Sequence, residues 1–511
     1  MPNTALTSFT YWTAELKYKK VKKSHNRSSM QKKLKILLVV LVFFSVFNCQ
    51  AQDTLSIGNL LTIQQCVDIA IKNNLLVRTS ETTMQSSKVL LNQSKDYLLP
   101  YINAQGNQGT GFGRNLNPYT YTYVDQQIVT GSYVLYSNLT LFSGLQILNS
   151  IKQYSYAYDA SKMDLQQQKD NITLSVILAY LQVLGSRDLL IISREQADVD
   201  AKQLRRLEIL NDAGSLLLLS DLSNLKGQYA GDQVNIATAV NNLETAKINL
   251  FQLLNIPYKK DLQYESIPVG PELPVYVASS DSIYQTALLT LPIIKSADLR
   301  IKSSRKALQA TRGQYFPTLS FYGSLNTSYS NAATINIPGT AIQVPTTDYV
   351  TVGGTNYNVI TKQQNFTTQN ISFGDQFKNN RFTAVGLQLT VPILNSLRAR
   401  NNVKQAKINL RIAENNANAT RLTLQQNVEL AFQNMISSFS QYKSYQDQVL
   451  AFAESFRTTE IRFNEGVINS DIYVLAKNNI DRANISLAQA KYNYIFRIKI
   501  LDYYQGRLAL Q

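Results

Sequence analysis

The stretch QSSKVLLNQSKDYLLP, from Gln85 to Pro100, has a close counterpart in KSSRKALQATRGQYFP, from Lys302 to Pro317. The two segments align without a gap at a constant offset of 217 residues, and they share the same order of small, basic and apolar positions. Solenoid repeats recur every ~20 to 50 residues, so this repeat is much too long to belong to a solenoid. The sequence therefore predicts a chain built from two large halves of similar structure.

A leader precedes the first half. In MQKKLKILLVVLVFFSVFNCQAQ, a basic segment is followed by an apolar run from Ile36 to Phe47 and by the small-residue site CQA. This order is typical of a secretory signal peptide, and the apolar run is shorter than the ~20 residues that span a bilayer. Residues 1–51 are therefore predicted to be a leader, with the mature chain starting near residue 52. Lipidation of Cys49 is a second interpretation, although the residues before it match a lipobox poorly.

The residue composition argues against catalytic chemistry. The chain has one histidine, His25, and two cysteines, Cys49 and Cys66. Without the leader only Cys66 remains, so the mature chain has no histidine base, no internal disulfide and no usual set of zinc ligands. Residues 1–51 hold nine of the 50 basic and one of the 34 acidic residues, which leaves 41 against 33. We therefore expect no enzyme activity, no cofactor, no metal and no nucleic-acid partner.

The placement of proline predicts very long helices. No proline lies between Pro118 and Pro257, and none follows Pro392. Since proline breaks helix interiors, such spans permit uninterrupted helices. A helix over residues 396–465 would be about 100 Å long at ~1.5 Å per residue, and Gly466 would mark the turn of a helical hairpin.

The apolar spacing in these spans is that of helices packed against one another. Apolar residues recur at steps of three, four or seven, which keeps one seam facing a neighbouring helix. The seam residues are Leu165, Ile172, Val176, Ala179, Val183 and Leu190 in one span, and Leu222, Leu225, Tyr229, Ile236, Val240, Leu243, Ala246, Leu250 and Leu253 in the next. The pattern predicts coiled-coil packing of long helices.

Between the helical spans the apolar period changes to two. SYVLYSNLTLFSG, residues 132–144, alternates between two faces, and FTAVGLQLTVPILNS, residues 382–396, is its counterpart in the second half. Alternation of this kind predicts β-strands that lie between two different environments. Pro100, Pro317 and Pro392 are interpreted as strand openings. Each half therefore has the predicted order helix, strand, loop, strand, long helix, turn, helix.

The domain boundaries follow from the repeat. We expect a first repeat over 56–265, a linker over 266–280, a second repeat over 281–506 and a short tail over 507–511. The offset between the halves grows from 217 to 252 between the two strands of each half. The second half therefore has a longer strand–strand loop, assigned to the Asn/Thr-rich tract 326–380, because insertions collect at exposed loops.

The duplicated plan resembles the TolC-like outer membrane efflux protein family over residues 56–506. The resemblance rests on LTIQQCVDIAIKNN from Leu61, on the strand openings at Pro100 and Pro317, on LTLFSG against LTVPILNS, on NDAGSLLLLSD against NEGVINSD, and on AKYNYIFRIKILDYYQG from Ala490. It implies a mixed α/β membrane protein that consists mostly of long α-helical coiled coils with four β-strands per protomer. Three protomers would share a twelve-stranded β-barrel in the outer membrane, continued by a periplasmic α-barrel.

The resemblance also implies a function and a set of partners. The expected function is a passive exit duct of a tripartite efflux or type I secretion system in a Gram-negative outer membrane, with the helical part in the periplasm. The expected partners are two further copies of the chain, a periplasmic membrane-fusion adaptor, an inner-membrane transporter and outer-membrane lipid. Tyr119, Tyr121, Tyr123, Tyr133 and Tyr136 would supply the interfacial aromatic ring of the barrel.

By the same resemblance, the functional residues lie at the two helical turns. The periplasmic gate would use Asp471 and its first-half counterpart Asp221, and the adaptor would contact Gly214, Gly466, Arg462 and Phe463. The family's second acidic position is Val474 here and its basic position is Ile468, so its ion pair is not available. An Asp after a turn is also a common helix N-cap, which leaves capping open as a role for Asp471.

A secreted periplasmic coiled-coil scaffold or adhesive protein without a channel is the alternative function. This alternative explains the helical seams. It does not explain alternating strands at matched places in the two halves.

Overall fold

The structure is a computed structural model that describes residues 60–117, 119–213, 219–266 and 273–507. The predicted leader, with Cys49, and the first turn glycine, Gly214, lie outside the described residues.

The described residues of the first half form a series of helices and strands that continues into a short linker. Its elements are β1 (Leu60–Leu61), α2 (Ile63–Asn73), α3 (Leu75–Asp96), β2 (Tyr101–Gly111), β3 (Arg114–Leu116), β4 (Tyr123–Asp125), β5 (Ile128–Ser143), α4 (Gln146–Asp212), α5 (Leu219–Leu254) and β6 (Gln263–Tyr264). Those of the second half are α6 (Ser280–Thr290), α7 (Pro292–Arg312), the 3-10 turn η3 (Gly313–Tyr315), β7 (Thr318–Ser330), β8 (Thr334–Val352), β9 (Thr355–Asn370), α8 (Phe373–Asn379), β10 (Phe382–Thr390), α9 (Arg398–Asn464) and α10 (Ser470–Tyr504).

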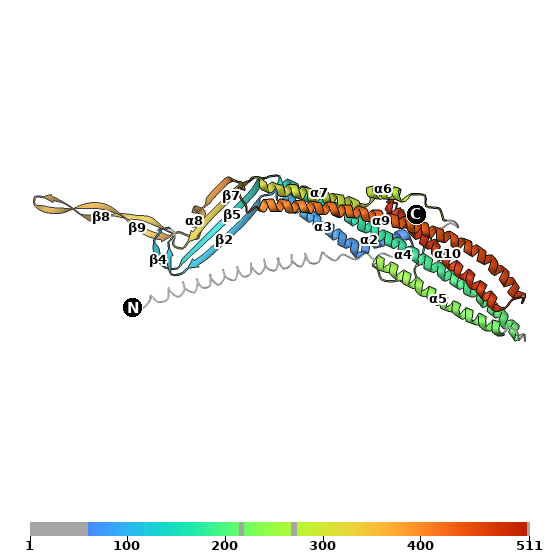
Figure 1. Ribbon diagram of the computed structural model, residues 1–511. Helices are drawn as coiled ribbons and strands as arrows, with labels where there is room; N and C mark the ends of the chain where they lie inside the picture. Colours follow the sequence, from blue (N-terminus) through green and yellow to red (C-terminus); the bar gives the residue numbers. More distant parts are fainter. Residues whose placement is uncertain (1–59, 118, 214–218, 267–272, 508–511) are drawn as a thin grey trace, which may run out of the picture. The chain divides into compact units, whose positions relative to one another are not determined.

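The two halves repeat one order of elements (Figure 1). The series α2, α3, β2, β5, α4, α5 corresponds to α6, α7, β7, β10, α9, α10. Ile63 at the start of α2 and Ser280 at the start of α6 are 217 residues apart, and the starts of α4 and α9 are 252 apart. Helices α4 and α9 each have 67 residues, so the very long helices predicted from the absence of proline are confirmed.

The strand-to-helix junctions of the two halves have the same unusual backbone. Gly144 and Leu145 have φ of +59° and +61° just before α4, and Ser396 and Leu397 have φ of +55° and +58° just before α9. Left-handed conformations at non-glycine residues cost about 1–3 kcal/mol each, so the surrounding packing must impose them. A Cβ atom on Gly144 would also lie 2.5 Å from the carbonyl oxygen of Gly313. The first junction therefore needs glycine for both its conformation and its space.

We predict that Gly144→Ala lowers the free energy of unfolding by at least about 2 kcal/mol, because the methyl group meets the Gly313 carbonyl in a strained backbone. Gly227→Ala is the control, since it lies inside α5 with open space around it and should stabilise the helix by about 0.5–1 kcal/mol. Thermal unfolding followed by circular dichroism measures both. Equal melting temperatures for Gly144→Ala and the unsubstituted protein would contradict this account of the junction.

Four strands form one antiparallel sheet in the order β10, β7, β5, β2. The central pair β5 and β7 joins the two halves, with Tyr133 opposite Thr327 and Ser143 opposite Thr318. Strands β2 and β10 are the edges, and each is paired on one side only among the described residues. The sheet therefore ends in two open rows of backbone hydrogen-bonding groups.

The strand assignment of Pro392 was wrong. Pro100 and Pro317 directly precede β2 and β7, but β10 ends at Thr390, which pairs with Thr318, the first residue of β7. No β7 residue remains to pair with the chain beyond Thr390, and proline has no N–H for a ladder. Pro392 therefore lies in the connection to α9.

The tract 326–380, expected as a loop, is largely regular structure. Its first residues belong to β7, its middle forms the β8–β9 hairpin, and its end contains α8. The hairpin turns at Gly353 and Gly354, whose φ values of +59° and +83° suit a two-residue turn. The Gly-Gly pair between residues of high β-propensity was the sequence signal for a hairpin.

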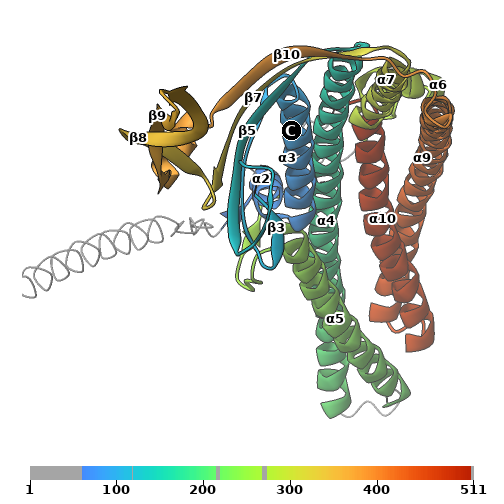
Figure 2. The same cartoon turned by 90° about the vertical axis from the view of Figure 1, so that its left-hand side faces the viewer.

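The long helices form two hairpins, α4–α5 and α9–α10, which are also in contact through α4 and α10 (Figure 2). Helix α4 packs in addition against α3 and α7. Among the described residues, α4 alone holds a stretch apolar and long enough to cross a bilayer, and half of that stretch is buried inside the protomer. Its packing against four other helices accounts for the buried half.

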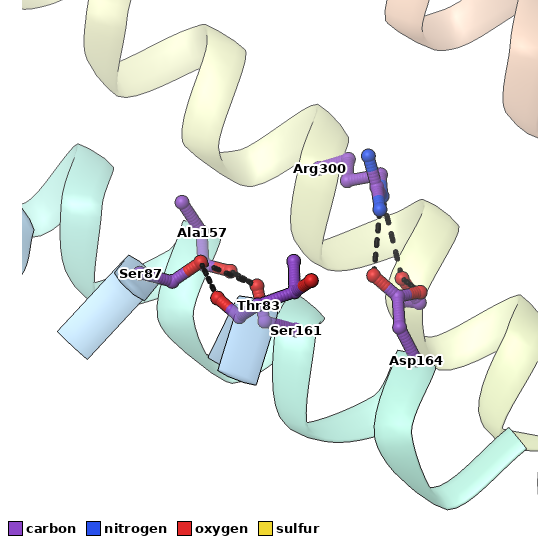
Figure 3. A network of polar contacts seen from close by, with 7 residues as sticks. Thr83, Ser87, Ala157, Ser161, Asp164 and Arg300 are labelled. Atoms are coloured by element: carbon purple, nitrogen blue, oxygen red, sulfur yellow. Dashed lines mark hydrogen bonds and ion pairs between the residues drawn. The ribbon is translucent and has the colours of Figure 1, made fainter. Parts of the chain in front are cut away.

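Polar side chains fasten α4 to the shorter helices α3 and α7 (Figure 3). The hydroxyls of Ser87 on α3 and Ser161 on α4 are 2.8 Å apart, and Arg300 on α7 lies 2.6 Å from the carboxylate of Asp164 on α4. The ion pair is largely exposed, so it contributes only about 0.2–1 kcal/mol. These contacts fix the positions of the helices more than they add stability.

Candidate functional site

The turn between α9 and α10 is tightly specified by its backbone. Gly466 has φ of +68°, and its N–H donates to the carbonyl of Phe463 while the N–H of Val467 donates to the carbonyl of Arg462 at 2.9 Å. This pair of hydrogen bonds is a Schellman motif, which requires a left-handed residue and favours glycine. Asn469 then caps α10 by accepting from the N–H of Ile472. The predicted hairpin turn at Gly466 is confirmed.

The two predicted gate residues lie together at the start of α10, although they come from different helices. Asp471 on α10 is exposed, and its carboxylate accepts a hydrogen bond of 2.7 Å from Asn224 on α5. Asp221 on α5 accepts a hydrogen bond of 2.9 Å from the backbone N–H of Ser470. Both carboxylates therefore face the positive end of the α10 dipole. The N-cap is Asn469, so the capping alternative considered for Asp471 does not hold in its simple form.

The four predicted tip residues behave differently. Arg462 and Gly466 are exposed at the turn, and Gly214 lies outside the described residues. Phe463 was expected to face an adaptor, but its ring is buried and stacks on Tyr473 with centroids 4.7 Å apart. Burial stabilises the ring against the neighbouring helices, so Phe463 positions the turn and is not available to a partner.

An apolar cluster beneath the turns includes residues from all four long helices. Its buried members are Leu207 on α4, Leu222 and Leu225 on α5, Phe463 on α9 and Tyr473 on α10. Polar bonds surround it, since Asn464 accepts from Gln203 and Arg206 on α4. The two hairpins are therefore joined at their turn ends by packing and by hydrogen bonds.

A buried charged cluster lies further along the same helices. The ammonium of Lys477 on α10 is 2.5 Å from Asp481 and 3.6 Å from Asp200 on α4, and it donates to the carbonyl of Gln196 at 3.3 Å. Asp200 and Lys477 are almost fully buried, and Asp232 on α5 is buried beside Asp200. Three carboxylates thus share one ammonium group in the interior of the bundle.

The carboxyl groups of this cluster are hard to ionise. Burial, with the neighbouring Asp232 carboxyl, raises the pKa of Asp200 to about 7 although Lys477 opposes the shift. Burial also raises the pKa of Asp481. A buried carboxylate without full compensation destabilises the packing around it. The contact of α10 with α4 and α5 should therefore be tightest when a carboxyl of the cluster carries a proton.

Sequence reasoning missed this cluster because it placed the α5 seam wrongly. The seam passes through Leu225, Asp232, Ala239 and Ala246 at steps of seven, and these residues are buried, while the expected Val240 is exposed. An Asp at a seven-residue step between apolar residues was the available signal. Such a position is costly for a charge unless a partner such as Lys477 faces it.

The pKa of Asp200 predicts a pH dependence of the helix packing. A carboxyl whose pKa is raised on folding stabilises the fold at low pH and loses that contribution as pH rises from about 4 to about 7. Between pH 5 and pH 8 the free energy of local opening of α10 should fall by roughly 1–3 kcal/mol. Hydrogen exchange of the amides around Lys477, corrected for intrinsic rates, measures this free energy.

Asp200→Asn, which stays neutral, should remove most of this pH dependence. Asp198→Asn is the control, because Asp198 lies on the same helix in an exposed pair with Lys202. The same pH dependence in the Asp200→Asn and control proteins would contradict the assignment.

The four-stranded sheet has one apolar and one polar face. The strand registers place Ile102, Ala104, Tyr133, Leu135, Leu139, Leu319, Phe321, Leu325, Val385, Leu387 and Leu389 on the same face. The other face carries Asn103, Gln105, Asn107, Tyr136, Asn138, Thr140, Tyr322, Ser324, Asn326 and Gln388. A β-bulge after Thr140 shifts the alternation, so Phe142 and not the expected Leu141 joins the apolar face. Most of the large apolar side chains are well exposed in the protomer.

The described residues hold no group of three side chains that could bind a metal ion. Cys66 lies in α2 with its thiol buried, and this burial raises its pKa to about 12. A thiol with that pKa stays protonated near neutral pH, which makes it a packing residue and a poor nucleophile.

Comparison with known sequences gives a consistent set of relatives. A family profile described as "Outer membrane efflux protein" matches residues 283–496. The Escherichia coli outer membrane protein TolC is 24% identical over 335 residues, which are 65% of this chain and 60% of that protein. The "Toxin and drug export protein A" of Aggregatibacter actinomycetemcomitans is 22% identical over 72% of this chain and 70% of its own length.

Solved structures of outer membrane channels share the fold. The Campylobacter jejuni CmeC channel aligns with a TM-score of 0.67 and 16% identity over 87% of this chain and 86% of that chain. The open state of the Neisseria gonorrhoeae MtrE channel aligns with a TM-score of 0.63 and 17% identity over 88% and 90%. At these identities the likeness concerns the fold.

Proposed function

This chain belongs to the TolC-like outer membrane efflux protein family, and on that premise we propose that it is the passive exit duct of a tripartite efflux or type I secretion system. The observation that carries the proposal is the sheet, which has an apolar face, a polar face and two open edges, and which continues directly into helices about 100 Å long.

The open edges are the argument for three copies. A bilayer contains no water to satisfy a free strand edge, so a spanning sheet must close on itself. In the proposed trimer, β2 of each protomer pairs with β10 of the next and twelve strands close one barrel. The apolar face then meets lipid and the polar face lines the pore, which is the alternation that outer-membrane barrels require.

The helices continue the duct through the periplasm in this proposal. The α4–α5 and α9–α10 hairpins of three protomers form the α-barrel wall, and their turns form its periplasmic end. An adaptor docks at the exposed residues Arg462 and Gly466, and an inner-membrane transporter supplies the driving force. The adaptor opens the end by binding the open arrangement more tightly than the closed one.

The scaffold alternative has no support in this comparison. A periplasmic coiled-coil protein has no need for a sheet whose apolar face is exposed beside a polar one, and the relatives named above are membrane channels or export proteins.

We predict that Leu387→Arg blocks membrane assembly, because Leu387 lies at mid-height on the apolar face and a buried arginine there costs about 2–4 kcal/mol. Gln388→Arg is the matched control, since the next residue of β10 faces the pore and meets water. The yield of trimer in outer-membrane fractions measures both. Equal yields for the two variants would contradict the assignment of the faces.

The gate proposal predicts that Asp471→Ala raises the leak of small hydrophilic molecules several-fold. The variant loses the bond to Asn224 that joins α10 to α5 at the proposed aperture. Uptake of a small hydrophilic dye by cells, or single-channel conductance in planar bilayers, measures the leak. Asp198→Ala, an exposed acid far along α4, is the control, and unchanged permeability in Asp471→Ala would remove this residue from the gate.

A further inference from the structure

Helix α8 lies on the apolar face of the sheet, at the end away from the long helices. The hydroxyl of Thr327 on β7 donates to the carbonyl of Phe377 at 2.9 Å, and the rings of Phe373 and Phe377 lie within 6.0 Å of the Tyr133 ring on β5. Gln376 is buried and bonds both backbone groups of Ser330, with its donated and accepted bonds at 2.8 and 2.9 Å. The helix is therefore firmly held against the sheet.

The position of α8 along the strands corresponds to one membrane interface. From Thr318 at the helix-facing end of β7 to Thr327 there are nine steps of ~3.3 Å, or about 30 Å along the strand. At the usual tilt of ~35–45° this is about 21–25 Å of depth, close to the ~25 Å apolar band of outer-membrane barrels. If the helices lie in the periplasm, as the proposed function holds, α8 lies at the level of the outer-leaflet headgroups.

A hollow of about 310 Å³ lies between α8 and the sheet. Its floor is formed by apolar-face residues that include Ala104, Leu135 and Leu325, and its rim by Phe377 and Arg381. The surface of the hollow is almost wholly apolar except at this rim. An alkyl chain suits such a floor, because apolar surface gains free energy when it is removed from water.

The rim is positively charged. The Nε of Arg381 donates to the carbonyl of Lys378 at 3.0 Å, and its two terminal nitrogens bond to no described residue. Lys378 is exposed one turn away, and its ammonium likewise has no partner in the described part of the chain. The only acid of α8, Asp375, is bonded to Ser372 at the start of the helix. A guanidinium with free nitrogens is well suited to a phosphate oxygen.

We propose that this hollow is a binding site for a phosphate-bearing anionic lipid of the outer leaflet, with an acyl chain against Leu135 and Leu325 and the phosphate on Arg381 and Lys378. The proposal rests on the proposed function, because it needs the apolar face to meet lipid. One lipid binds per protomer, so three bind per trimer. The lipid covers the apolar surface that α8 leaves open.

The test uses the full-length trimer extracted from outer membranes, delipidated and titrated with phosphatidylglycerol or with zwitterionic phosphatidylcholine. Native mass spectrometry counts the lipids retained. We expect three tightly retained phosphatidylglycerols and weaker retention of phosphatidylcholine. Arg381→Gln should weaken phosphatidylglycerol binding about tenfold, which corresponds to 1.4 kcal/mol. Ala104→Phe, which fills the floor and leaves the charges, should also reduce the number retained.

Lys362→Gln on β9 is the control, since it removes an equal charge outside the hollow and should bind lipid like the unsubstituted protein. Equal retention by the unsubstituted protein, Arg381→Gln and Ala104→Phe would overturn the site, as would no retention of either lipid. In those cases a normal trimer in the outer membrane leaves the proposed function standing. A soluble protein in place of that trimer would overturn the proposed function and the lipid site together.

Discussion

A sheet inside a bilayer has no water to complete its hydrogen bonds, and this constraint governs the whole arrangement of the chain. The four strands satisfy one another in the centre, through β5 and β7, and leave β2 and β10 open. Closure by neighbouring protomers satisfies both edges at once and gives the apolar face a lipid environment. The duplication of the chain then has a simple physical role, because each half supplies one strand pair and one long helical hairpin to the same wall.

The helical part has a different constraint, which is to hold two hairpins together at their turns without making the contact permanent. An apolar cluster with Phe463 and Tyr473 supplies affinity, and hydrogen bonds such as that of Asn224 to Asp471 supply geometry. The buried group of Asp200, Asp232, Asp481 and Lys477 has more acidic than basic members, so its contribution depends on protonation. A joint of this kind is stable in one arrangement and still within reach of a partner that binds the other.

Much of this architecture could be predicted from sequence because the repeat, the absence of proline and the two apolar periods are local signals. The turn at Gly466 is an example, since a Schellman turn needs a left-handed residue. Other features depend on what lies opposite. Pro392 falls outside the sheet because β7 has no residue left to pair with it. The burial of Phe463 depends on Tyr473, and the β-bulge that moves Phe142 to the apolar face depends on the register with β7. The placement of α8 and its hollow follows from contacts across the sheet that no single segment reveals.

The central claim is that the strands of three protomers close in the outer membrane, and one measurement tests it most directly. Native membranes are separated on a density gradient, and the protein is run on a denaturing gel with and without heating. The account predicts a species in the outer-membrane fraction that migrates as a trimer unheated and as a monomer after heating. A soluble periplasmic species of monomer or dimer size in both samples would contradict it.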